Sequence, residues 1–232
     1  MSYKSLSFII PVRNEKNNIS PITQRLSELA ESRNYSYEII FIEDGSSDDS
    51  LNMMLRQQEK NPNIIVAKTL NCHGKGEALE KGFEAARNNI VITIDADLQE
   101  DPNEIPNLIK KLEDGYDAVF SWRTNREDKI YKKLRSRIFN LLVNSTWKLN
   151  LHDQNCGLKA FRRHCTQGLD LSGGRYRFIS VILKKKGLRI TEIPVSHRKR
   201  LRDKSKYRLL SSFSAICDYL KFAASPRSFS CD

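Results

Sequence analysis

The chain has 232 residues, of which 39% are hydrophobic and 29% charged, a composition typical of a folded globular protein and too apolar for an intrinsically disordered one. No apolar run reaches the roughly 18 residues that a membrane-spanning helix needs. The net charge of +11 is unevenly divided, because residues 1–117 carry 13 Lys/Arg against 20 Asp/Glu and residues 118–232 carry 26 against 8. This excess predicts an anionic partner for the second half: a phosphorylated substrate, phospholipid or nucleic acid.

Cysteine and histidine usage argues against a disulfide framework or a zinc site. The five cysteines are scattered without a CxxC pair, and the four histidines lack the spacing of metal ligands. Reduced thiols in a cytosolic protein fit this pattern best. The opening residues contain too short an apolar run for a signal peptide and are expected to form a first strand.

Apolar runs alternate with helical patterns through the first 120 residues. The predicted strands are Leu6–Val12, Tyr37–Glu43, Ile64–Lys68, Ile90–Ile94 and Asp117–Ser121, and the helices predicted between them are Ile19–Ala30, Asp48–Gln58, Glu77–Arg87 and Ile105–Leu112. Such alternation predicts an α/β fold with a central, mostly parallel sheet and helices on both faces, a Rossmann-like layout.

The second half of the chain has a less regular pattern. Its predicted elements are a long basic helix at Glu127–Leu149, a short strand at Cys156–Phe161, a helix at Arg177–Lys186, a strand at Leu188–Val195, a charged loop at Ser196–Arg208 and an amphipathic helix at Leu209–Ala224.

The segment Ile90–Pro102 carries the strongest chemical signal. An apolar strand runs directly into Asp95, Ala96 and Asp97, followed by Gln99. Ligands of open α/β sheets bind beyond the carboxyl ends of the strands. A divalent cation relieves the repulsion between two such carboxylates, and Asp and Gln oxygens suit Mg²⁺ or Mn²⁺ completed by substrate phosphates. The alternative for an isolated DxD is a solvated acidic turn.

Polar loops also follow the other predicted strands of the first half. Lys75 lies in a Gly-Lys-Gly segment that is not a P-loop, and Arg123 follows the fifth strand. Both are candidates for contacts with phosphates. Five polar loops at one sheet edge favour a site for a nucleotide diphosphate.

The segments PVRNE, EDGSSDDS, NxxGKG and DADLQEDP, in this order, resemble the inverting family 2 glycosyltransferases. LHDQNCGLKAFRR at Leu151–Arg163 and the RxxxxSKY element within Tyr176–Arg208 are similar to dolichol-phosphate mannose synthase and the polyprenyl-phosphate sugar transferases. The resemblance covers roughly residues 5–222. It implies one GT-A-type catalytic domain over residues 1–208, followed by an amphipathic, juxtamembrane segment at 209–232.

The resemblance also implies roles for the residues that match the donor side of the family pattern. Those lining the nucleotide pocket would be Pro11, Arg13 and Glu15, with Ile42 and Asp44 near the base and ribose. Asp95 and Ala96 would contact the nucleotide sugar. Asp97 and Gln99 would hold Mg²⁺ or Mn²⁺ on the diphosphate.

On the acceptor side, Arg123, Arg200 and Lys206 match positions that embrace the phosphates of donor and acceptor. Asp153 matches a position where many relatives place a catalytic carboxylate. A phosphate acceptor needs little deprotonation, so Asp153 is expected either to act as that carboxylate or to position a loop or an arginine.

One departure from the family pattern lies in the basic loop. Relatives usually read HRPRxYGKSKY where this chain reads HRKRLRDKSKY, so Arg202 replaces an aromatic residue and Asp203 a glycine. Glycine permits backbone geometries that Asp adopts less readily. The change affects the expected mobility of the loop or its donor preference, and leaves open a catalytically silent relative.

The expected reaction is metal-dependent transfer of a hexose from a nucleotide-diphosphate sugar to a dolichyl or undecaprenyl phosphate, with anomeric inversion. The protein is expected at the cytosolic face of a membrane, bound to the anionic surface or to an integral-membrane partner subunit. An alternative is a glycosyltransferase acting on a saccharide or protein hydroxyl, with Asp153 as general base. Nucleic-acid binding is disfavoured, because the sequence has no basic stripe with interleaved aromatics.

Overall fold

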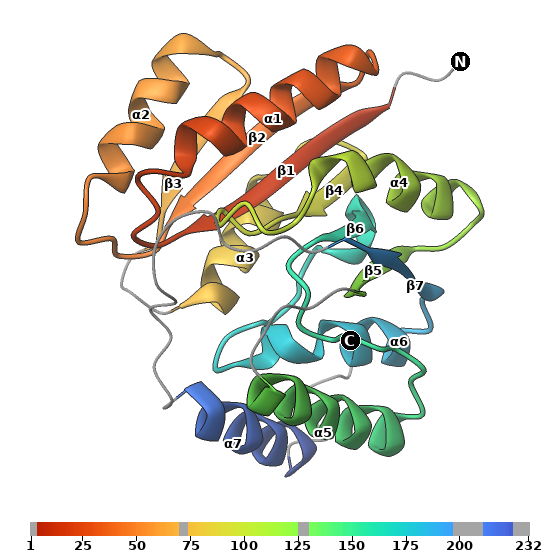
Figure 1. The fold of residues 1–232 in the computed structure, drawn as a ribbon. Coiled ribbons are helices and arrows are strands. Elements are labelled where there is room, and N and C mark those ends of the chain that lie inside the picture. Colours follow the sequence, from red (N-terminus) through yellow and green to blue (C-terminus); the bar gives the residue numbers. More distant parts are fainter. Residues whose placement is uncertain (1–3, 70–73, 125–129, 197–210, 225–232) are drawn as a thin grey trace.

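The computed structural model describes residues 4–69, 74–124, 130–196 and 211–224. A seven-stranded sheet in the order β3-β2-β1-β4-β6-β5-β7 forms its centre (Figure 1). Four of the six strand pairings are parallel, and both pairings of β6 are antiparallel. The predicted α/β class with a mostly parallel sheet is confirmed.

The first half of the sheet matches the predicted alternation of strands and helices. Its strands are β1 (Ser5–Val12), β2 (Ser36–Glu43), β3 (Ile64–Lys68) and β4 (Ile90–Thr93), connected through α1 (Ile19–Ser32), α2 (Ser50–Lys60) and α3 (Lys75–Ala85). Each predicted boundary lies within two residues of the observed one. Long apolar runs explain this accuracy, because strands buried on both faces are apolar throughout.

Two hydrophobic cores lie on opposite faces of the sheet. Phe8 and Ile10 of β1 belong to the core that includes α1, α2 and α4 (Ile105–Glu113), whereas Ile9 belongs to the core that includes α3 and α6 (Ile179–Lys185). Successive side chains of a strand point to opposite faces, so a single strand supplies both cores. The helices therefore cover both faces, as a doubly wound fold requires.

The second half adds β5 (Ala118–Arg123), β6 (Lys159–Arg162) and β7 (Ile190–Val195). The strand predicted at Cys156–Phe161 begins three residues later, at Lys159. Residues before it form a turn, in which the Asn155 amide donates to Asp153 Oδ1 at 3.1 Å and the Gly157 amide to Glu100 Oε1 at 3.1 Å. These side chains replace the ladder partners that a longer strand would have used.

Two helices predicted in the second half have different bounds in the part of the chain that the structure describes. The helix predicted at Glu127–Leu149 is α5 (Ile130–Trp147), and the one predicted at Arg177–Lys186 is divided into a 3-10 turn, η3 (Arg175–Phe178), and α6. Gly174 precedes η3 with φ of 87°. Short 3-10 segments η1 (Pro102–Glu104) and η2 (Arg163–Cys165) precede α4 and follow β6.

The last described helix, α7 (Ser211–Ala224), lies beside α5 at the bottom of Figure 1. Phe222 stacks on Phe178 with ring centroids 4.3 Å apart, and the Tyr219 ring lies 5.6 Å from that of Trp147. The described part of the predicted C-terminal segment therefore packs on the domain. Within the described residues, no helix combines the length and apolarity needed to cross a membrane.

Candidate active site

The loops after β1 and β2 are braced against each other at the carboxyl edge of the sheet. Asn14, with φ of 57°, accepts hydrogen bonds at its Oδ1 from the amides of Ser47 at 2.6 Å and Asp48 at 3.2 Å. The amide of Glu15 donates to Ser50 Oγ at 2.8 Å. These contacts fix the segment that carries Arg13 relative to the segment that carries Asp44.

A hollow opens between these loops, the start of α3 and the η3 segment. Its lining residues include Arg13, Asp44, Lys75, Tyr176, Arg177 and Asp218. Asp44 is buried and accepts hydrogen bonds from Thr69 Oγ1 and from the Gly74 amide, both at 3.2 Å. We call this hollow the edge pocket.

The other residues predicted to line the nucleotide pocket, Pro11, Glu15 and Ile42, make different contacts in the structure. Pro11 lines a second pocket, which shares Lys75 and Tyr176 with the edge pocket and is also lined by Asp95. The Glu15 carboxylate accepts a hydrogen bond from Asn18 Nδ2 at 2.6 Å. Ile42 is fully buried and packs in the core on the α3 side of the sheet. The structure thus brings Arg13 and Asp44 to a common pocket and gives Ile42 a packing role.

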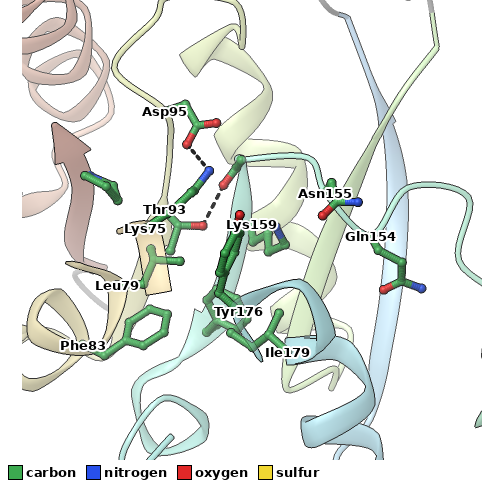
Figure 2. A pocket seen from close by; sticks show the side chains of 13 residues that line it. Lys75, Leu79, Phe83, Thr93, Asp95, Gln154, Asn155, Lys159, Tyr176 and Ile179 are labelled. Atoms are coloured by element: carbon green, nitrogen blue, oxygen red, sulfur yellow. Dashed lines mark hydrogen bonds and ion pairs between the residues drawn. The ribbon is translucent and has the colours of Figure 1, made fainter. Parts of the chain in front are cut away.

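Asp95 forms an ion pair with Lys75 of α3 (Figure 2). Burial alone would raise the pKa of Asp95, but the neighbouring Lys75 ammonium holds it below its usual value. The carboxylate is therefore ionised at neutral pH. Gly157 makes the placement possible, because a Cβ at that position would lie 2.6 Å from the carboxyl carbon of Asp95.

Asp97 and Gln99 lie in a tight turn directly after Asp95. Leu98 has φ of 62°, and the Gln99 amide donates to Asp97 Oδ1 at 3.2 Å. Both side chains are partly exposed, whereas Ala96 between the two aspartates is buried. Two hard oxygen ligands directly after Asp95 in the sequence fit a Mg²⁺ or Mn²⁺ that takes its other ligands from substrate phosphates and water.

Glu100 was not singled out by the sequence, although it directly follows the DADLQ run. The residue is 3% exposed, and within the described part of the chain its Oε2 has no hydrogen-bond partner. Burial, together with the charges of Asp95 and Asp97, raises the pKa of Glu100 to about 8. A third acid packed this closely fits a site that receives a cation.

Arg123 and Asp153 form a buried bidentate pair. Arg123 Nε donates to Asp153 Oδ2 at 2.6 Å and Nη2 to Oδ1 at 3.2 Å, with side-chain exposures of 15% and 5%. Burial would lower the pKa of Arg123, but Asp153 raises it. Of the two roles predicted for Asp153, this geometry favours positioning of an arginine.

Lys159 of β6 is a second residue that the sequence analysis missed. It lines the pocket of Figure 2, and its Nζ donates to the carbonyl of Cys156 and lies 5.9 Å from the Phe120 ring centroid. Burial and the nearby Lys75 lower the pKa of Lys159. The only signal in the sequence was a lysine next to apolar residues of a predicted strand. Its place in the site becomes clear only from the pairing of β6 with β4 and β5.

Arg200 and Lys206, predicted to act on the phosphates, fall outside the described residues, as do Arg202 and Asp203. Their predicted roles remain untested.

Comparison with known proteins identifies related sequences and folds. Residues 7–169 match the family model described as glycosyl transferase family 2. The chain is 35% identical over 218 residues to an undecaprenyl-phosphate 4-deoxy-4-formamido-L-arabinose transferase of Serratia proteamaculans, covering 94% of this chain and 67% of that protein. The same-named protein of Klebsiella pneumoniae strain 342 is 36% identical over 93% of this chain and 66% of its own length. The chain thus spans about two thirds of these relatives.

Among solved structures, glucosyl-3-phosphoglycerate synthase from Mycobacterium tuberculosis superposes with a TM-score of 0.76 at 21% identity, covering 97% of this chain and 82% of that one. A structure of the same protein with Mn²⁺, UDP and glucosyl-3-phosphoglycerate gives a TM-score of 0.75. This likeness confirms the predicted GT-A-type fold.

The raised pKa of Glu100 yields a prediction about stability in metal-free buffer. The pKa of Glu100 is near 8 in the folded protein and has its ordinary value of about 4.5 in the unfolded chain. Between these two pH values the carboxyl group keeps its proton only in the folded state, so the free energy of unfolding falls as pH rises from about 4.5 to 8. Glu100→Gln keeps the neutral form and should reduce this loss. We expect a melting temperature a few degrees above wild type at pH 9 and little difference at pH 5.

Thermal unfolding of both proteins at the two pH values in EDTA measures this effect. Glu59→Gln, on the exposed surface of α2, is the matched control and should behave as wild type at both pH values. Equal pH dependence in wild type and Glu100→Gln would contradict the assignment.

Proposed function

Because the chain belongs to glycosyl transferase family 2, we propose that it transfers a sugar from a nucleotide-diphosphate donor to the phosphate of a polyprenol, with inversion at the anomeric carbon. The relatives at 35–36% identity are named for transfer to undecaprenyl phosphate. Their names specify a 4-deoxy-4-formamido-L-arabinose, whereas the sequence motifs suggested a hexose. The proposal therefore names the reaction and the acceptor, and the transfer assay below identifies the donor sugar.

The observation that carries the proposal is the arrangement of charged groups at the carboxyl edge of the sheet. The Lys75–Asp95 pair lies next to the Asp97–Gln99 turn, and Arg123 is held by Asp153. A diphosphate brings negative charge that Lys75 and Arg123 can bind, and a sugar or ribose brings hydroxyl groups that can donate hydrogen bonds to Asp95. A solvated acidic turn would not pair its first carboxylate with a lysine from another helix in this way.

Asp97 and Gln99 are the residues proposed to hold Mg²⁺ or Mn²⁺. When bound, the cation would neutralise charge on the departing nucleoside diphosphate. A structure of the M. tuberculosis protein contains Mn²⁺ and UDP-glucose, which supports a divalent cation in this fold but does not choose between the two metals. Lys75 keeps Asp95 ionised and oriented.

On the acceptor side, a phosphate is already anionic and needs no strong base to remove a proton. Arg123 has N–H groups beyond the two that bind Asp153, and these can donate to phosphate oxygens. The role we propose for Asp153 is therefore to orient Arg123. Arg200 and Lys206 are proposed to complete the phosphate contacts.

The surface formed by α5 and α7 is the proposed contact with the membrane, at its cytosolic face. Large apolar side chains are exposed on both helices: Ile138, Leu141 and Leu142 on α5, and Ile216 and Leu220 on α7. We call these five residues the apolar face. The sequence around α5 is rich in lysine and arginine, which suits an anionic leaflet. An integral-membrane partner subunit is the competing occupant.

The metal proposal predicts that Asp97→Asn lowers the turnover number on the order of 100-fold while the fold persists. The substitution removes an anionic ligand, and losing charge stabilisation of a few kcal/mol in the transition state produces a loss of this size. The assay is transfer from a panel of UDP- and GDP-sugars to a short polyprenyl phosphate with Mn²⁺. Asp114→Asn, a surface carboxylate paired with Lys111, is the control and should retain wild-type turnover.

Two outcomes of that assay would count against the proposal. Normal turnover of Asp97→Asn in saturating Mn²⁺ would exclude Asp97 as a metal ligand. Nucleotide binding without transfer of any sugar by the wild type would favour the catalytically silent relative.

The pairing of Asp153 with Arg123 predicts how Asp153→Asn should behave. The amide retains one acceptor oxygen but loses the charge that fixes the guanidinium, so turnover should fall roughly 10- to 100-fold. The pH profile of kcat should keep its shape, because an orienting residue does not exchange a proton. Disappearance of the acid limb in Asp153→Asn would instead identify a general base, as a hydroxyl acceptor requires.

The apolar face predicts direct binding to lipid vesicles. Wild-type protein should co-sediment with vesicles containing anionic lipid at low salt and bind less at high salt. Leu141→Gln combined with Leu220→Gln should weaken binding on the order of tenfold or more, because two apolar contacts are lost. Leu55→Gln, an exposed leucine on α2, is the control. Absence of wild-type binding at low salt would favour the partner subunit.

A further inference from the structure

Helix α7 reaches the edge pocket as well as the apolar face. Its Asp218 lines the pocket together with Arg13, Asp44 and Lys75, although more than 140 residues separate Asp218 from any of these in the sequence. Arg13 and Asp44, both predicted to line the nucleotide pocket, line the edge pocket, so we take it as the nucleotide site. One wall of this site is supplied by a helix whose other side is exposed.

Asp218 is held in that wall by the η3 segment. Arg177 Nε lies 3.2 Å from Asp218 Oδ2, and both side chains are largely buried, with exposures of 19% and 15%. The Arg177 guanidinium also lies 4.8 Å from the Tyr176 ring centroid. A Cβ on Gly174 would overlap the Asp218 carboxylate, so the close approach depends on glycine at this position.

The same position of α7 is required for the apolar face. Phe222 packs on Phe178, and Tyr219 packs on Trp147 and shares a 2.7 Å hydrogen bond with Thr146 Oγ1. With these contacts made, Ile216 and Leu220 are 49% and 60% exposed, while α5 exposes its own apolar residues. A helix of 14 residues gains most of its stability from packing, so its docking and its folding are linked.

We propose that binding of an anionic bilayer to the apolar face and binding of a nucleoside diphosphate in the edge pocket strengthen each other, through the contact between Asp218 and Arg177. Each ligand contacts a surface that is complete only when α7 is docked, so each increases the population of the docked state that the other binds. The inference rests on the proposed function, because it takes the pocket as the nucleotide site.

Such coupling is reciprocal and can be measured on the wild-type protein without an acceptor lipid. The affinity for UDP and for GDP, each with Mn²⁺, is measured by calorimetry with and without vesicles of phosphatidylcholine and phosphatidylglycerol. The affinity for the same vesicles is measured with and without the nucleotide that binds. We expect vesicles to tighten nucleotide binding at least fivefold, and the nucleotide to tighten vesicle binding by the same factor.

Asp218→Asn tests the route of the coupling, with Asp114→Asn, at an exposed carboxylate paired with Lys111, as the matched control. The amide removes the ion pair at nearly constant volume, so the coupling factor should fall to within twofold of one. The control should keep the wild-type factor. Near-UV circular dichroism verifies that Asp218→Asn is folded, and the wild-type measurement stands if it is not.

The outcomes separate this inference from the proposed function. Nucleotide affinity that is equal with and without bound vesicles overturns the coupling, and normal sugar transfer in detergent would then leave the proposed function intact. A coupling factor unchanged by Asp218→Asn overturns the proposed route through the contact between Asp218 and Arg177. Failure of both nucleotides to bind under any condition overturns the nucleotide pocket, and with it both proposals.

Discussion

Strand β6 runs antiparallel between β4 and β5, and the Thr93 hydroxyl donates to the carbonyl of Gly157 at 2.8 Å where β6 approaches β4. This pairing determines the register in which Lys159 lies opposite both Thr93 and Phe120. With that register, Gly157 lies beside Asp95 and Asp153 reaches Arg123 at the end of β5. A slip of one residue would turn Lys159 to the other face of the sheet and separate these groups.

The register also explains why the site is close to charge balance before a ligand enters. Lys75, Arg123 and Lys159 lie near Asp95, Asp97 and Asp153, and Glu100 retains its proton at neutral pH because burial and the neighbouring aspartates raise its pKa to about 8. Isolated buried charges would be costly, and pairing makes them tolerable. A divalent cation that enters together with a diphosphate brings little additional net charge, so such a ligand suits a site that is already near neutral.

The sequence predicted those features that depend on neighbouring residues. Apolar runs located β1 to β4, and the polar residues directly after β4 identified Asp95, Asp97 and Gln99 as candidates. Features set by distant pairing were missed. Glu100 is recognised by its contact with the turn before β6, and Lys159 by the pairing of β6 with β4 and β5. Asp218 reaches the edge pocket because α7 packs on α5 and η3. For Asp153 the sequence left two roles open, and the hydrogen bond from Arg123, which the sequence could not reveal, supports the proposed orienting role.

The place of β6 in the sheet also bears on the order in which the chain folds during synthesis. β4 ends at Thr93, but its partner on the open side begins at Lys159, after α4, β5 and α5 have been made. Until then, a nascent chain with β1 to β4 assembled has an unpaired edge at β4, which can pair with other chains. The late strand therefore protects the early half from aggregation, and a fragment that ends before β6 should associate through that edge.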